Sequence, residues 1–162
     1  MRNVSIIAAV VACLLTGCVS HKPAKTANGS ASAPGQKFEV DDNSQIEAAV
    51  YHYLLEKHPW GDGEYAAIFL EGDEARVAAF IKTIPQHVPP LKPSGQAQLD
   101  ANQAPVDKDT GRPGLLLSAK AVDPTNDVSE AIGNWNGGPA TTGVSAFVLL
   151  KMDGKWTIQS VQ

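Results

Sequence analysis

The sequence predicts an α+β fold, in which one or two N-terminal helices pack on a curled antiparallel sheet of four to five strands. Apolar residues recur at helical spacing over 44–58 and again over 73–84. From residue 114 onward, short runs rich in β-branched, leucine and aromatic residues are separated by turn residues, as in antiparallel strands. A sheet with one apolar face needs a cover, and the first helix is the best candidate for it.

The first predicted helix begins at Ser44. Ser44 and Glu47 have the spacing of a capping box, in which both side chains satisfy free amide groups of the first turn. Pro59 ends the helix, because the residue before a proline disfavours the helical conformation. The apolar positions on one face of this helix are Ile46, Ala49, Val50, Tyr53 and Leu54.

A short buried strand over 65–70 and a second helix follow. Asp73 is the expected cap of that helix, and Pro85 comes directly after its last turn. The segment 85–114 holds six prolines and few large apolar residues, so we expect mostly loop, with some order near 88–91. The apolar face of the second helix consists of Val77, Phe80, Ile81 and Ile84.

Four strands are predicted in the remaining chain, over 115–122, 128–135, 143–151 and 155–161. Residues 123–126 turn between the first two. Asp153 and Gly154 suit a type I′ turn between the last two, because that turn needs positive φ at both central positions. Strands joined by short turns are antiparallel. Trp156, at the start of the last strand, is expected in the core.

The composition limits the possible partners and chemistry. A chain of 162 residues suits one domain with appendages, and its net charge of −4 comes without any cluster of Lys or Arg. Nucleic acid is therefore not an expected partner. The two cysteines are Cys13, inside an N-terminal apolar run, and Cys18. The chain beyond them has no thiol for a disulfide, a metal or a nucleophile.

The first residues have the pattern of an export signal. A positive start at Arg2 precedes twelve mostly apolar residues, which are too few to cross a bilayer. The run Leu15-Thr16-Gly17-Cys18 then resembles the lipobox of bacterial lipoproteins. This resemblance implies that 1–17 is removed and that Cys18 carries the lipid; the alternative is an ordinary signal peptide with a chance cysteine.

The same resemblance implies a location. Val19 follows the cysteine, whereas in the Gram-negative sorting pattern an Asp there retains the protein at the inner membrane. We therefore expect an outer-membrane anchor facing the periplasm. Several acyl chains on one residue make such attachment effectively permanent. Residues 18–43 read as the lipidated cysteine and a flexible tether, and 44–162 as a single α+β domain.

The runs 106–111 and 151–156 look like those of small bacterial exported proteins that end in a Gly-rich strand and an Asp-Gly-Lys-Trp hairpin. Their architecture is similar to cystatin-like and nuclear transport factor-like folds. The shared residues are turn formers and a core Trp, which report the fold rather than an activity.

The sequence predicts no catalytic set, metal site or cofactor. His52 and His58 point about 120° apart on a helix and cannot share one metal ion. The alternating acids of 107–111 lack the later ligands of a calcium loop, so a surface turn is the better interpretation. Ser145 lacks the final glycine of a nucleophile elbow.

Trp135, with Asn134 and Asn136 beside it, is the candidate binding surface, because an aromatic ring among small residues can contact a ligand. The alternative is that Trp135 fills the space left by the neighbouring glycines at 133, 137 and 138.

The expected function is a lipid-anchored, non-catalytic binding or structural module of the cell envelope, with the membrane and an envelope protein as partners. One alternative is a nuclear transport factor-like enzyme or small-molecule pocket protein, with His87, Asp100 or Glu130 pointing inward as a base. Another is an envelope inhibitor or immunity lipoprotein.

Overall fold

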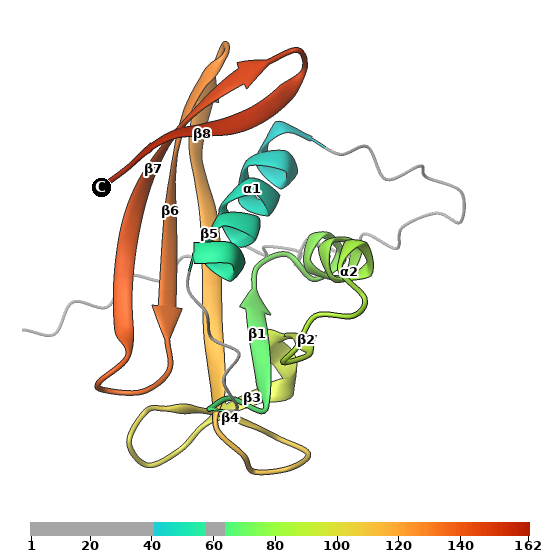
Figure 1. Ribbon diagram of the computed structural model, residues 1–162, viewed down its shortest axis with the longest axis vertical. Coiled ribbons are helices and arrows are strands. Elements are labelled where there is room, and N and C mark those ends of the chain that lie inside the picture. The colour runs from blue at the N-terminus through green and yellow to red at the C-terminus, as the bar shows by residue number, and fades with distance from the viewer. Residues whose placement is uncertain (1–40, 58–63) are drawn as a thin grey trace, which may run out of the picture. The chain divides into compact units, whose positions relative to one another are not determined.

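A computed structural model describes residues 41–57 and 64–162 of the chain (Figure 1). This part of the chain contains two α-helices and eight strands. Six strands form one sheet in the order β2-β1-β5-β6-β7-β8, and β3 pairs with β4 separately. The α+β class is therefore confirmed. The predicted signal, Cys18 and residues 18–40 of the predicted tether lie outside the described residues, as do His21, His58 and Trp60. Residues 41–43, also assigned to the tether, instead form the cap and the first residues of α1. The elements are α1 (Asp42–Lys57), β1 (Ala67–Glu71), α2 (Glu74–Thr83), β2 (Leu91–Pro93), η1 (Ser94–Gln96), β3 (Ala97–Leu99), β4 (Pro105–Asp107), β5 (Gly114–Thr125), β6 (Val128–Asn136), β7 (Thr142–Met152) and β8 (Lys155–Val161).

The sheet is mixed, so the prediction of four to five antiparallel strands is wrong in detail. Strands β5 to β8 form the expected antiparallel meander. Strand β1, however, runs parallel to both β2 and β5, and α2 makes the connection from β1 to β2. Residues 67–70 of β1 are all buried, which is typical of a parallel strand covered on both faces.

Helix α1 begins earlier than predicted, because Asp41 provides the cap in place of Ser44. The Asp41 carboxylate accepts hydrogen bonds from the backbone N–H and from the hydroxyl of Ser44, both at 2.7 Å. This is the N-cap arrangement that satisfies a free amide of the first turn. The predicted Ser44–Glu47 capping box is wrong, and Glu47 instead lies beside Arg76 of α2.

Helix α2 has the predicted cap and face. The Asp73 carboxylate accepts a hydrogen bond from the backbone N–H of Arg76 at 3.0 Å, and the helix ends at Thr83, before Pro85. Val77 and Phe80 are buried. In Figure 1, α2 lies beside β1 and β2, whereas α1 crosses the face of β5 and β6.

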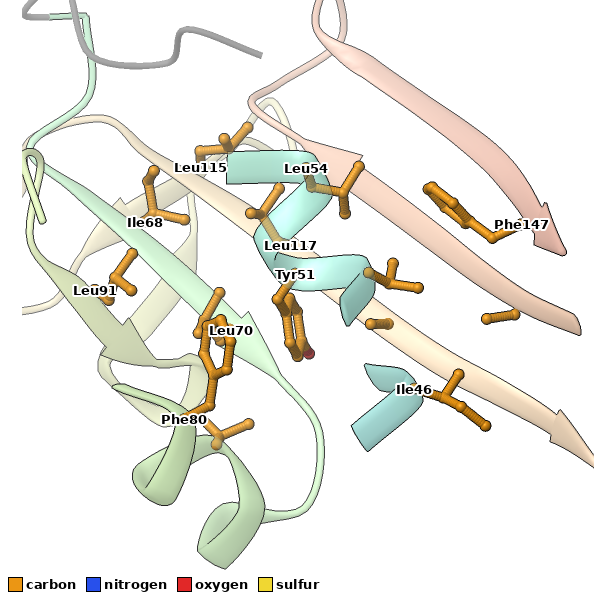
Figure 2. Close-up of a cluster of buried hydrophobic side chains, with 14 of the residues drawn as sticks. Ile46, Tyr51, Leu54, Ile68, Leu70, Phe80, Leu91, Leu115, Leu117 and Phe147 are labelled. Atoms are coloured by element: carbon orange, nitrogen blue, oxygen red, sulfur yellow. The ribbon is translucent and has the colours of Figure 1, made fainter. Parts of the chain in front are cut away.

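The core lies between α1 and the sheet, as predicted. Figure 2 shows Leu54 of α1 facing Phe147 of β7, and both side chains are fully buried. Gly133 of β6 makes room for this contact, since a Cβ there would lie 2.9 Å from both Phe147 Cε2 and Val50 Cγ1. Trp156 is buried, which confirms its predicted place.

The start of α1 is fastened to the hairpin of β7 and β8. Asp42 Oδ1 accepts hydrogen bonds from Lys151 Nζ at 2.7 Å and from Trp156 Nε1 at 3.1 Å. The hydrogen bond from Lys151 lowers the pKa of Asp42. The hairpin turn has φ values of 51° at Asp153 and 75° at Gly154, which confirms the type I′ prediction.

The turn between β5 and β6 differs from the prediction. Strand β5 continues to Thr125, beyond the predicted turn at 123–126, because the pairing with β6 shifts register between Val122 and Thr125. The chain reverses instead at Asn126, whose φ is 55°. The segment 85–114 is mostly loop, as predicted; β2, η1, β3 and β4 within it are three residues long each, and the order predicted near 88–91 overlaps β2 only at Leu91.

The Asp107 side chain is buried and joins two strands by hydrogen bonds, so Asp107 is not a surface-turn residue. Its side chain is 3% exposed; it accepts hydrogen bonds from Lys92 Nζ at 2.7 Å and from the backbone N–H of Asp109 at 2.9 Å. These bonds link β4 to β2. The hydrogen bond from Lys92 is the main reason why the pKa of Asp107 is lowered.

Asp107→Asn is expected to lower the melting temperature at pH 7. The melting temperature of this variant should also fall less steeply than that of the wild type as the pH is lowered. Because the folded-state pKa of Asp107 is lowered, its contribution is present above the ordinary aspartate pKa of about 4 and is lost as the pH falls below that value. Thermal unfolding followed by circular dichroism between pH 7 and pH 2.5 measures both effects. Asp109→Asn is the control, since Asp109 is 77% exposed and lies 3.7 Å from Lys92. Equal effects of the two variants would contradict the assignment.

Candidate functional site: the groove between the two helices

The predicted surface around Trp135 is divided between two faces of the sheet. Successive strand residues alternate in direction, so β6 places Trp135 on the face that α1 covers and Asn134 on the opposite one. The Trp135 ring packs over Gly143, where a Cβ would lie 2.1 Å from Trp135 Cζ2. Asn134 donates a hydrogen bond to Ser118 Oγ at 3.0 Å. Ligand binding by these residues stays a prediction.

Asn136 ends β6 and holds the following loop. Its side-chain oxygen accepts a hydrogen bond from the backbone N–H of Gly138 at 2.9 Å, and its amide nitrogen lies 3.4 Å from the carbonyl oxygen of Gln103. Both contacts are to the backbone of neighbouring loops, which is the pattern of a residue that shapes a turn.

The three residues considered as an inward base lie at three separate places. His87 Nδ1 is 2.7 Å from the carbonyl oxygen of Pro89. Asp100 accepts hydrogen bonds from two backbone N–H groups of its own loop, and Glu130 is exposed on β6. Among residues 41–57 and 64–162, no three His, Cys, Asp or Glu side chains are placed to hold a metal ion.

A groove between α1 and α2, here called the helix groove, is the candidate site that the structure adds to those predicted from the sequence. Its volume is about 250 Å³, and its walls are mostly apolar. Sequence reasoning assigned the apolar positions of both helices to the core and so missed it. The lining residues are Ser44, Glu47, Ala48, Tyr51 and His52 from α1, and Arg76, Val77, Ala79, Phe80 and Thr83 from α2.

Two aromatic side chains form the floor of the helix groove. The ring centroids of Tyr51 and Phe80 are 5.4 Å apart, and His52 meets Phe80 edge-on at 5.0 Å. The Tyr51 hydroxyl donates a hydrogen bond to the carbonyl oxygen of Glu71 at the end of β1. Burial raises the pKa of Tyr51, so its hydroxyl remains a donor at neutral pH. Figure 2 shows the Tyr51 ring beside Leu70 of β1 and Phe80 of α2. The hydrogen bond to Glu71 fixes this floor to the sheet.

One end of the helix groove carries three charged side chains. Arg76 lies between two carboxylates, with Nη2 at 2.7 Å from Asp41 Oδ2 and Nη1 at 3.5 Å from Glu47 Oε2. The Glu47 side chain is only 18% exposed. Burial raises the pKa of Glu47 and outweighs the opposing effect of Arg76. The groove therefore combines an apolar floor with a rim of one positive and two negative groups.

Glu47→Gln is expected to remove the part of the unfolding free energy that the wild type loses through Glu47 as the pH rises. Because the folded-state pKa of Glu47 is raised, wild-type stability from this group is highest below the ordinary glutamate pKa of about 4.3 and falls as the pH rises through the folded-state value. Urea unfolding at pH 4 and pH 7 should therefore show a smaller decrease for Glu47→Gln than for wild type. Glu74→Gln, an exposed change at the start of α2, is the control. A wild-type pH dependence in Glu47→Gln would contradict this assignment.

Comparison with known proteins gives no match for this chain, whether with protein-family models, with curated proteins or with solved structures. Within the described residues, neither helix has the length and apolar character needed to cross a membrane. The helix groove and the N-terminal sequence are thus the features on which a functional assignment rests.

Proposed function

We propose that this chain is a lipid-anchored, non-catalytic binding module of the bacterial cell envelope, whose helix groove receives an apolar side chain of a partner protein. The observation that carries the binding role is the groove itself, an apolar hollow of about 250 Å³ between two helices. The anchoring rests on the resemblance of Leu15-Thr16-Gly17-Cys18 to a lipobox.

The size of the helix groove favours a side chain over a complete small molecule. Sites for drug-sized ligands measure roughly 300–1,000 Å³, whereas this groove has about 250 Å³. Protein interfaces concentrate much of their binding energy in one or a few large apolar side chains inserted into such pockets. The aromatic floor of Tyr51 and Phe80 suits an aliphatic or aromatic anchor.

The rim favours a basic residue beside that anchor. Asp41 and Glu47 contribute two negative charges and Arg76 one positive charge, so the rim has a net charge of 1 − 2 = −1. The Asp41 side chain is 52% exposed and keeps room for a second cation. Complementary charges at the edge of an interface raise the association rate and select among partners.

Attachment through Cys18 gives the binding role its location. In the proposed arrangement, residues 18–40 tether the domain to the periplasmic face of the outer membrane, an assignment based on Val19 after the cysteine. A tether of this kind keeps the helix groove at high effective concentration near envelope partners.

Photo-crosslinking from the edge of the helix groove tests the binding role. A photoreactive residue replaces Thr83, which lines the groove, or Lys82, its exposed neighbour outside it. We expect an adduct in cells from position 83 that is weak from position 82. Ala79→Trp, which fills the groove, should abolish the adduct, and Ala75→Trp, on the exposed surface of α2, should leave it unchanged.

The melting temperature of Ala79→Trp separates a filled groove from a misfolded domain. The proposal is wrong if positions 82 and 83 give the same adducts, or if a folded Ala79→Trp protein is crosslinked as efficiently as wild type.

Labelled palmitate tests the anchor separately. The wild-type chain should incorporate label and sediment with membranes, and Cys18→Ala should do neither. An unlabelled wild-type chain would remove the lipid-anchored part of the proposal without affecting the helix groove.

A further inference from the structure

The face of β5, β6 and β7 that points away from α1, here called the outer face, carries a diagonal row of exposed apolar side chains. Val122 and Ile132 are each 40% exposed and Val144 is 63% exposed. The register fixes their arrangement, because Val122 lies opposite Glu130, and Val144 opposite Asn134, on either side of Ile132. Each step along the row moves one strand across and two residues along.

Two opposite charges flank this row. Lys120 lies opposite Ile132, and Glu130 lies opposite Val122, so the two charges stand on either side of the line through the apolar residues. Both side chains are exposed. Neither forms an ion pair with any other residue in the described part of the chain.

We infer that the outer face binds a second copy of this chain about a two-fold axis that runs along the row. Rotation about this axis brings Val122, Ile132 and Val144 each against its own counterpart. The same rotation places Lys120 of one copy against Glu130 of the other, twice over, so that both unpaired charges gain a partner. A two-fold interface requires this kind of self-complementary surface.

The geometry also agrees with known sheet packing. The row runs diagonally to the strands, so the two-fold axis sets the strands of the two copies at a steep angle, as in orthogonal sheet packing. A hollow of about 280 Å³ beside Ile132, lined also by Ala146 and Val148, gives the opposing apolar side chains space to enter.

The expected dimer is weak and leaves the helix groove open. With strands about 4.8 Å apart and rising about 3.4 Å per residue, three strands of this face cover roughly 400 Å². Stable interfaces bury about 800 Å² per partner, so we expect a dissociation constant in the micromolar range or weaker. The helix groove lies on the other side of the sheet, beside α1.

Disulfide trapping in the full-length chain tests the axis. Val144 lies on the axis, so Val144→Cys should give a disulfide-linked homodimer on mild oxidation. Met152→Cys is the matched control, because Met152 is 49% exposed on the same strand but lies away from the row. The wild-type chain, oxidised in the same way, is the background control for any dimer that forms through Cys13 or Cys18. Equal dimer yields from positions 144 and 152 would overturn the inference.

Charge reversal tests the pairing independently. Lys120→Glu alone and Glu130→Lys alone each place like charges together, and each should weaken dimerisation about tenfold or more in sedimentation equilibrium. The double variant Lys120→Glu/Glu130→Lys restores opposite charges and should recover the dimer. Because both residues are exposed, folding should be unaffected. A double variant as monomeric as the single ones would overturn the inference.

Discussion

Phe147→Ala is expected to destabilise the domain by about 3–5 kcal/mol, the range for removal of a buried aromatic ring. Phe147 is fully buried beneath α1, where its ring meets Tyr53 edge-on at a centroid distance of 5.3 Å and lies against Gly133. Small domains have a total stability of about 5–15 kcal/mol, so this single change removes a large part of it.

Urea unfolding monitored by circular dichroism measures this loss. Met152→Ala is the matched control on the same strand; Met152 is 49% exposed, and we expect an effect within about 0.5 kcal/mol. Similar losses in the two variants would mean that the Phe147 side chain does not pack beneath α1 as described.

Gly133→Ala is expected to cost about 1–3 kcal/mol, because it forces a methyl group into a filled space. A Cβ at this position would lie 2.9 Å from Phe147 Cε2, 2.9 Å from Val50 Cγ1 and 3.2 Å from Leu54 Cδ1. Either the helix moves away from the sheet or these side chains leave their preferred conformations. Both adjustments lower the free energy of unfolding.

Gly95→Ala is the control for this change, since a Cβ at Gly95 has no atom within 4 Å. Its expected effect is within about 0.5 kcal/mol. If Gly133→Ala proved as stable as Gly95→Ala, the close approach of α1 to β6 would be wrong.

The elements that the sequence predicted well depend on local patterns. Helical spacing located both helices, and the turn at Asp153 and Gly154 fixed the hairpin of β7 and β8. The start of α1 was misplaced because the spacing of Ser44 and Glu47 matches a capping box, whereas the bond that caps the helix runs from the Ser44 backbone N–H to Asp41, three residues earlier. The parallel pairing of β1 was missed because its partners, β2 and β5, lie 20 to 50 residues away in sequence.

The helix groove could not be predicted from the sequence, because it also depends on contacts between segments that are distant in sequence. Tyr51 and Phe80 belong to the apolar faces of their helices, and a pattern cannot tell a buried contact from a hollow between two helices. The converse error affected the surface around Trp135. Alternation along β6 was enough to place Asn134 and Trp135 on opposite faces, although the sequence makes them neighbours.

The contact of Asp42 with Lys151 and Trp156 also governs when the domain can form during biosynthesis. A ribosome finishes α1 roughly a hundred residues before it delivers the hairpin that holds the start of that helix. An isolated helix of 16 residues is only marginally stable in water, so α1 depends on contacts with later parts of the chain. The native contacts at the start of α1 can therefore form only after residues 151 and 156 have been synthesised.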